Sequence, residues 1–295
     1  MREFLSFLIP GIMSGFVYSL IALGFVLIFK SSGVLNLAQG ELVIIGAYIF
    51  YAITTQLGLP IWAAVLCTLI LLGILGLLIE RTAMRPLIGQ PILAVIMVTL
   101  AIAGILDGIM IVAWGSNVLA LPSLFPAGGL SFVGITISYN RLVFMLISLA
   151  LIGVLLAFFR FTSTGLSMAA AADDQQAAQS TGIKVSRVLA ITWAITAIVS
   201  GIGGILLTSV TGVHYSNIGI GLSSIAVVLL GGLESVGGVI LAGPLVGAIQ
   251  GITSGYLDPH IHGGSMVDVT PYIVLVIVIM IRPTGLFGWK RIERV

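Results

Sequence analysis

The sequence predicts an all-α membrane protein that crosses the bilayer repeatedly, through about eight to nine transmembrane or half-membrane helices, with a further helix on the cytoplasmic side. Three observations predict this fold. Only 7% of the 295 residues are charged and 59% are hydrophobic, whereas a soluble domain carries about 25% charged residues. The apolar residues form runs of spanning length, and the basic residues gather at the ends of those runs.

Nine apolar segments occupy most of the chain, which we treat as one transmembrane domain covering residues 1–295. A spanning helix needs about 20 largely apolar residues. The segments are 4–29, 37–57, 61–79, 92–114, 142–159, 188–210, 222–233, 236–256 and 271–281. Segment 222–233 is too short to cross alone, so we expect a half-helix or a re-entrant segment. Broken backbone at that depth needs cover from protein or from a watery cavity.

Lysine and arginine set the orientation, because they favour the cytoplasmic ends of membrane segments. With the C-terminus in the cytoplasm, ten of the twelve basic residues lie on the cytoplasmic side, and only Arg2 and Arg141 lie outside. This arrangement also places the N-terminus outside. The small net charge of +2 gives no reason to expect nucleic-acid binding.

Enzymatic and metal-binding signatures are missing from the sequence. There is no Gly-Lys dipeptide and hence no phosphate-cradling loop, and there is no Gly-x-Ser-x-Gly nucleophile elbow. The single cysteine, Cys67, allows no intrachain disulfide. His214, His260 and His262 fall near the predicted outer surface, where an exposed loop is a better explanation than a metal site. We therefore expect neither an enzyme nor a cofactor-binding protein.

Three carboxylates fall at or near membrane depth, where burial is costly and often marks a polar pathway. Asp107 lies within segment 92–114, Glu41 near the start of 37–57, and Glu234 between the two late segments. Each could instead bond a neighbouring helix or sit at a helix start, where the dipole is positive. Both roles stay open for Asp107, and helix capping is favoured for Glu41 and Glu234.

Small residues recur at helical spacing. Gly243, Gly247, Gly251 and Gly255 form one smooth helix face, which allows close approach of another helix in lipid. The pairs Gly11/Gly15 and Gly104/Gly108 repeat the spacing. The pattern fits a tightly packed bundle or a partner helix equally well.

The longest predicted cytoplasmic loop covers residues 162–187. Its middle, residues 168–179, is rich in alanine and glutamine, which favour a helix, and Gly182 is a suitable helix stop. A short helix on this face is either a docking element or an ordinary interfacial helix. Composition alone favours the second.

Five short motifs occur in order along almost the whole chain. They are GVLNLAQGE at 33–41, ERTAMRPL at 80–87, the loop 164–183, VLLGGLESVGG at 228–238 and RPTGLFG at 282–288. Together they resemble the membrane subunits of branched-chain amino-acid ABC importers, which work with an external solute-binding protein. The resemblance implies a permease that moves branched-chain or other amino acids across the prokaryotic cell (inner) membrane by alternating access.

The resemblance also implies partners and site residues. The partners are a second homologous permease, two cytoplasmic subunits that bind and use ATP, an extracytoplasmic solute-binding protein and membrane lipid. The implied substrate pathway contains Asn36, Gln39, Glu41, Asp107 and Glu234. The implied coupling loop to the ATPase contains Gly165, Ser167, Met168, Ala169, Asp173, Asp174 and Gly182.

Three positions depart from the family pattern. Ala169 stands where an arginine is usual, Gln39 replaces a histidine, and Glu234 replaces a glycine. Charged docking to the ATPase could therefore differ, and the cargo could instead be urea, an amide or an aromatic acid. A secondary transporter or channel acting alone, with Asp107 as its ion site, is the alternative from another class. An intramembrane enzyme is a remote third.

Overall fold

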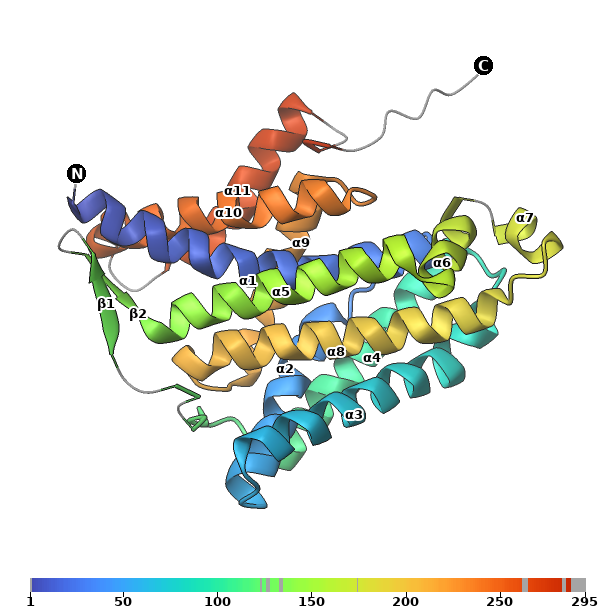
Figure 1. Cartoon of the computed structure of the whole chain (residues 1–295), viewed down its shortest axis with the longest axis horizontal. Helices are drawn as coiled ribbons and strands as arrows, with labels where there is room; N and C mark the ends of the chain where they lie inside the picture. The colour runs from blue at the N-terminus through green and yellow to red at the C-terminus, as the bar shows by residue number, and fades with distance from the viewer. Residues whose placement is uncertain are drawn as a thin grey trace. The chain divides into compact units, whose positions relative to one another are not determined.

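The computed structural model is almost entirely helical (Figure 1), which confirms the predicted fold class. It describes residues 2–122, 124–125, 128–132, 135–173, 175–261, 265–282 and 285–287. The α-helices are α1 Arg2–Ser32, α2 Gln39–Tyr51, α3 Ile61–Ile79, α4 Ile92–Trp114, α5 Tyr139–Phe161, α6 Ser163–Asp173, α7 Gln175–Ser180, α8 Val185–Thr211, α9 Gly219–Gly231, α10 Val236–Tyr256 and α11 Met266–Ile281.

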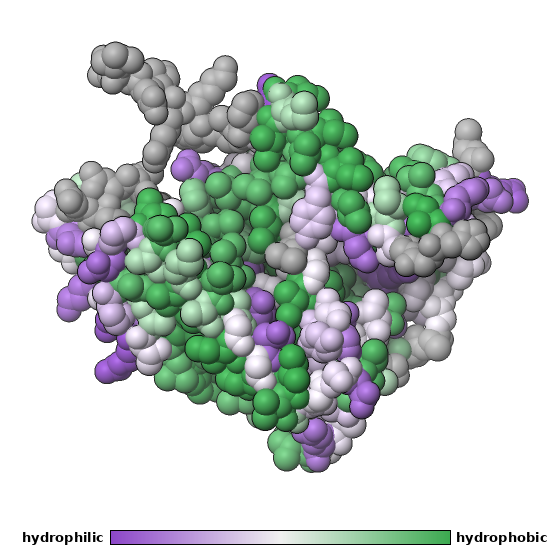
Figure 2. Space-filling model, turned by 180° about the vertical axis from the view of Figure 1, so that it is seen from behind, coloured by the Kyte–Doolittle hydropathy of each residue, from purple (hydrophilic) through white to green (hydrophobic). Residues whose placement is uncertain are grey.

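A helix covers most of the described part of each of the nine predicted segments, although the ends differ by a few residues. Six of the described helices are long and apolar enough to cross a membrane, while α9 and α11 are apolar but shorter. Helix α2 continues as a π-helix, Ala52–Gln56. Apolar side chains cover much of the face shown in Figure 2, and only 22% of the residues in the apolar window of each of α3, α4 and α5 are buried. Lipid is the solvent that suits such a surface.

The chain divides into two compact units. One contains Met1–Val26, Phe125–Leu149 and Leu222–Val295, and the other contains Leu27–Leu124 and Ala150–Gly221. Each unit therefore combines stretches that are far apart in the sequence.

Close backbone contacts build the unit that contains α8. Both α2 and α3 pack along α8 (Figure 1). A side-chain carbon on Gly46 of α2 would collide with Gly201 of α8, and one on Gly204 would collide with the carbonyl of Val43. Glycine allows this approach, which helps helices associate in lipid, where no hydrophobic force drives them together.

The other unit contains the glycine stripe, which faces α1. Gly243, Gly247 and Gly251 of α10 lie against the backbone of α1 between residues 7 and 19, and Gly255 lies against the ring of Phe7. The hydroxyl of Ser19 donates to the carbonyl of Val239 at 3.1 Å, and it is fully buried. The small face therefore packs within the chain. Gly104 and Gly108 on α4, by contrast, meet nothing within 4 Å.

Two local features were not predicted. Strands β1, Gly129–Phe132, and β2, Ile135–Ser138, form an antiparallel hairpin in the predicted external loop. The predicted cytoplasmic helix at 168–179 is helical at every residue that the structure describes, as α6 and α7, but α6 begins earlier than predicted, at Ser163. The hydroxyl of Thr162 accepts from the N–H of Gly165 at 3.0 Å, as an N-cap does, and so starts α6 early.

The C-terminal segment completes the short helix α9. The N–H of Leu286 donates to the carbonyl of Leu230 at 2.8 Å, and the N–H of Phe287 donates to that of Gly231 at 3.3 Å. The last carbonyls of a helix have no partner within it. A helix that ends within a membrane domain needs such partners from elsewhere in the protein.

Candidate functional site

A buried polar network fixes the loop between α1 and α2. The side chain of Asn36 accepts from the N–H of Ala38 at 3.0 Å and donates to Gln39 Oε1 at 3.2 Å. Gln39 in turn donates through Nε2 to the hydroxyl of Ser200 on α8. Asn36, Gln39 and Ser200 are at most 1% exposed. The network therefore ties the start of α2 to α8.

The same loop is tied to α4. The N–H of Leu37 donates to the hydroxyl of Thr99 at 3.3 Å, and that hydroxyl also donates to the carbonyl of Ile96. The loop between α1 and α2 thus has fixed contacts on two helices. Hydropathy does not reveal these contacts, but the closely spaced Asn36 and Gln39 are a polar signal that the sequence does carry.

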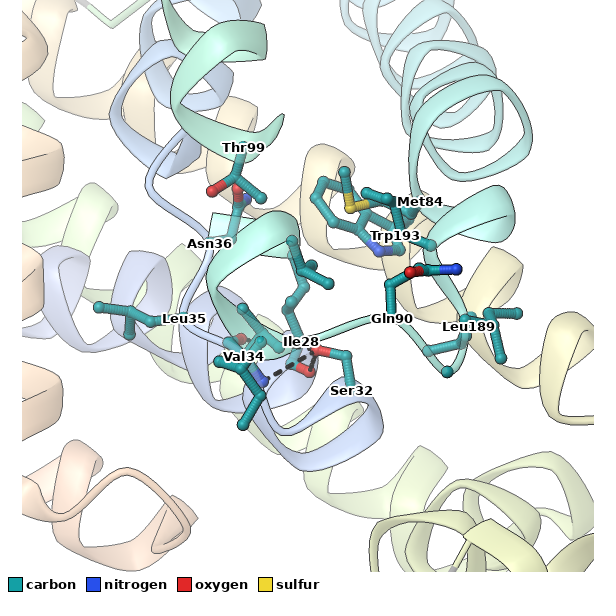
Figure 3. A pocket seen from close by; sticks show the side chains of 15 residues that line it. Ile28, Ser32, Val34, Leu35, Asn36, Met84, Gln90, Thr99, Leu189 and Trp193 are labelled. Carbon is teal, nitrogen blue, oxygen red and sulfur yellow. Dashed lines mark hydrogen bonds between the residues drawn. The ribbon is translucent and has the colours of Figure 1, made fainter. Parts of the chain in front are cut away.

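A cavity of about 250 Å³ lies beside this loop (Figure 3). Asn36 and Thr99 lie next to each other at one side, and Met84 and Trp193 lie side by side at another (Figure 3). Gln90, from the loop between α3 and α4, adds a further amide. An apolar lining with a few amide and hydroxyl groups suits a small amphipathic solute.

An ion pair organises the α3–α4 loop that lines part of this cavity. Glu80, which is 1% exposed, accepts from Nε and Nη2 of Arg85 at 3.1 and 3.0 Å. The two residues flank a π-helical turn, Glu80–Met84, of a kind often found at functional sites. The motif ERTAMRPL therefore supplies both the ion pair and Met84 of the cavity.

Two of the predicted pathway carboxylates lie on helices that contact each other. Glu41 in the first turn of α2 and Asp107 of α4 are close enough to interact electrostatically. Glu41 is 8% exposed, and its Oε2 accepts no hydrogen bond. Asn36, Gln39, Glu41 and Asp107 therefore all lie along the α2–α4 side of one unit.

Glu234 does not belong to the same unit as these four residues. It is exposed, in the turn between α9 and α10, which belongs to the other unit. The prediction that it caps a helix is wrong, because the N-cap of α10 is Ser235, whose hydroxyl accepts from the N–H of Gly238 at 3.0 Å. The neighbouring serine was the better capping signal in the sequence.

The family model for the permease component of branched-chain amino acid transport systems matches residues 7–281. The chain belongs to this family. The high-affinity branched-chain amino acid transport system permease protein LivH of Salmonella typhimurium is 28% identical, over 99% of this chain and 98% of that protein. The corresponding protein BraD of Pseudomonas aeruginosa is 29% identical with the same coverage. A probable LivH of Methanocaldococcus jannaschii is 27% identical, over 93% of this chain and 90% of its own length.

The resemblance inferred from the five motifs is therefore confirmed. This permease is a multi-pass membrane protein, and its relatives are named as permeases of transport systems.

The permease presents a defined surface on its predicted coupling loop. Met168 is 4% exposed and packs with Ala171, Ala178 and Val188, so it holds the loop against α8. Gly165 lies against the backbone of Phe158 and Phe159, where a side-chain carbon would collide. These contacts fix the base of the loop on helices of the same unit.

The exposed side of α6 carries Leu166, which is 70% exposed, and Ala169 three residues later. The sequence alone did not single out Leu166, because hydropathy does not distinguish it from the many other apolar residues of the chain. Ser167 is partly exposed, and Gly182 has φ +87°, which suits a helix stop. Asp174 and the side chain of Asp173 lie outside the described residues.

The two described histidines of the permease lie at short 3-10 helices: His214 directly precedes Tyr215–Ile218, and His260 is the last residue of Asp258–His260. His214 contacts the carbonyl of Ser116 through Nε2 at 2.8 Å, and His260 contacts that of Tyr256 through Nδ1 at 2.9 Å. His262 lies outside the described residues. In the part of the chain that is described, no three metal-ligating side chains gather.

Proposed function

We propose that this permease provides the membrane pathway through which an ATP-driven importer moves branched-chain amino acids into the cell by alternating access. The family match over residues 7–281, with relatives named for these substrates, carries the proposal. The cavity chemistry supports it. Met84 and Trp193 offer apolar surface for an aliphatic side chain, while the exposed amide of Gln90 offers a polar group for the other end of the solute.

The energy comes from other subunits. Since the sequence has no phosphate-cradling loop, two cytoplasmic ATP-binding subunits bind and hydrolyse the ATP, and this chain needs no cofactor of its own. A second homologous permease and an extracytoplasmic solute-binding protein complete the importer. The exposed side of α6, with Leu166 and Ala169, supports a role in docking to the ATP-binding subunits.

The permease lies in the prokaryotic cell (inner) membrane with its C-terminus in the cytoplasm. The charge bias supports this orientation, because ten of twelve basic residues then lie on the cytoplasmic side. The same orientation places α6 and α7 on the side where ATP is available.

Reconstitution in liposomes tests the proposal. The permease, its partner permease and the two ATP-binding subunits are purified together, with the binding protein added outside. We expect ATP-dependent uptake of leucine, isoleucine and valine. Uptake of urea, short amides or aromatic acids but not of these amino acids would contradict the substrate assignment. Uptake by this chain alone, driven by an ion gradient without ATP, would contradict the importer.

A further inference from the structure

Helices α2 and α4 hold two sets of polar and aromatic side chains at matching positions. Glu41 and Tyr48 are seven residues apart on α2, and Asp107 and Trp114 are seven apart on α4, so each pair shares one helix face. The helices contact each other, and the rings of Tyr48 and Trp114 lie 5.0 Å apart at 30°. The bond from Leu37, in the loop just before α2, to Thr99 of α4 is a second contact. The carboxylates therefore lie between two fixed contacts.

Three buried oxygens in this region have no hydrogen-bond partner. They are Glu41 Oε2, Asp107 Oδ1 and the hydroxyl of Tyr48. Glu41 is 8% and Tyr48 0% exposed, and Asp107 interacts electrostatically with both. Buried polar atoms almost always find a partner, and an unpaired buried carboxylate is among the costliest groups in a protein. The hydroxyl of Tyr48 lies near the backbone of Tyr215, so the two carboxylate oxygens are the groups for which the described chain supplies no partner.

The missing partner has the chemistry of a cation. Within the described part of the chain, the ion pair is that of Arg85 with Glu80, so neither Glu41 nor Asp107 has a basic side chain within 4.0 Å there. Two carboxylates and a hydroxyl offer several acceptor positions. A primary ammonium group carries three donors and no acceptor, and its hydrogen bonds to carboxylates are of the strong, charge-assisted kind.

We propose that Glu41 and Asp107, with the hydroxyl of Tyr48, bind the α-ammonium group of the transported amino acid. The inference rests on the proposed function and makes it more specific. A solute without an amino group, such as a carboxylic acid, would leave the carboxylates unpaired. The permease would then contribute to selectivity itself, in addition to any choice made by the binding protein.

The position of the cluster along the pathway supports this role. Asn36, in the loop just before α2, and Thr99, on α4, both line the cavity. An amino acid bound at Glu41 and Asp107 is therefore near the cavity, whose polar and apolar side chains form the next part of the proposed pathway.

Direct binding to the assembled complex tests the proposal without the binding protein. Radiolabelled leucine and its deaminated analogue, 4-methylpentanoate, are titrated onto the purified permease–ATPase complex. The variants are Glu41→Gln, Asp107→Asn and Tyr48→Phe. The controls are Glu3→Gln, in the exposed first turn of α1, and Tyr51→Phe, on the partly buried end of α2.

We expect the wild-type complex to bind leucine in preference to the analogue. Each carboxylate variant should lose about tenfold to a hundredfold in leucine affinity, as expected for a lost charge-assisted hydrogen bond, with little change for the analogue. The controls should bind as wild type. If Glu41 and Asp107 only share a proton with each other and do not bind the solute, leucine affinity is unchanged in Glu41→Gln. This result would overturn the proposal.

Two further measurements separate the possible failures. An equal loss of affinity for leucine and for the analogue would mean a general collapse of the site, and it would also overturn the proposal. A midpoint of thermal unfolding equal to or above that of wild type supports the proposal, because each amide variant removes an unpaired buried charge. If wild-type liposomes import leucine but the purified complex binds leucine no better than 4-methylpentanoate, the ammonium site is refuted and the proposed function stands. Failure of wild type to import any branched-chain amino acid refutes the proposed function.

Discussion

The side-chain amide of Gln39 donates a hydrogen bond to the hydroxyl of Ser200, which joins the first residue of α2 to α8. Both side chains are fully buried. Because Asn36 also donates to Gln39, one side chain connects the loop beside the cavity to α8. Gln39 is therefore a structural junction in this chain.

Replacing Gln39 should loosen that junction. Gln39→Ala leaves the Asn36 amide without its acceptor in a dry site, which costs about 1–3 kcal/mol for each unsatisfied group. We expect a lower midpoint of thermal unfolding in detergent and slower uptake in liposomes. Gln56→Ala, at an exposed position near the end of the same helical segment, is the matched control. An unchanged midpoint for Gln39→Ala would show that the network does not stabilise the loop.

Arg85 should matter more than its exposed neighbour Arg81. Arg85→Ala leaves the buried carboxylate of Glu80 unpaired, and since Arg85 is 44% exposed, we expect a partial loss of about 1–3 kcal/mol. Arg85→Lys should restore only part of the loss, because lysine cannot reproduce the two-nitrogen contact. Thermal unfolding measures the change, and Arg81→Ala should behave like wild type. Equal effects of the two alanine variants would contradict this role of the ion pair.

The glycine stripe predicts opposite outcomes for two similar substitutions. Gly247→Ala would place a carbon against the backbone of Gly11 and Gly15, and overpacking of this kind costs about 1–3 kcal/mol or more. Gly153→Ala, on α5, meets nothing within 4 Å and should gain up to about 1 kcal/mol in helix propensity. Yield of monodisperse protein and thermal midpoint measure both. A Gly247→Ala variant as stable as wild type would show that α1 and α10 pack less closely.

Cysteine labelling tests the orientation of the coupling loop. Cys67→Ser removes the single native thiol, and Ala169→Cys places a new one on the exposed side of α6. We expect a membrane-impermeant maleimide to label this variant in inside-out vesicles and not in intact cells. Labelling from outside would reverse the predicted topology and remove the basis for docking to ATP-binding subunits.

The helical segments could be predicted because lipid imposes a simple rule on length and polarity. The rule also identified 222–233 as too short to cross, and α9 has 13 residues. It says nothing about where a helix starts within a polar loop, so the early start of α6 at Ser163 was missed. The hairpin of β1 and β2 was missed too, because the turn residues of that loop fit several conformations.

Helix pairing was the part that the sequence could not provide. Glu41 and Asp107 are separated by more than 60 residues, and hydropathy gives no information on which faces meet, since lipid and helix surfaces are equally apolar. The glycine spacing predicted a packing face on α10 but not its partner α1. Likewise, the polar types of Asn36 and Gln39 marked a site, whereas their link to Ser200 emerged only from the fold.

The bonds from Leu286 and Phe287 to the end of α9 have a practical consequence for anyone labelling this permease. A reporter protein spliced in place of the last residues would expose two helix carbonyls and disturb α9 itself. Fusions and affinity tags should therefore leave Leu286 and Phe287 in place, because a variant shortened before them loses both bonds to α9.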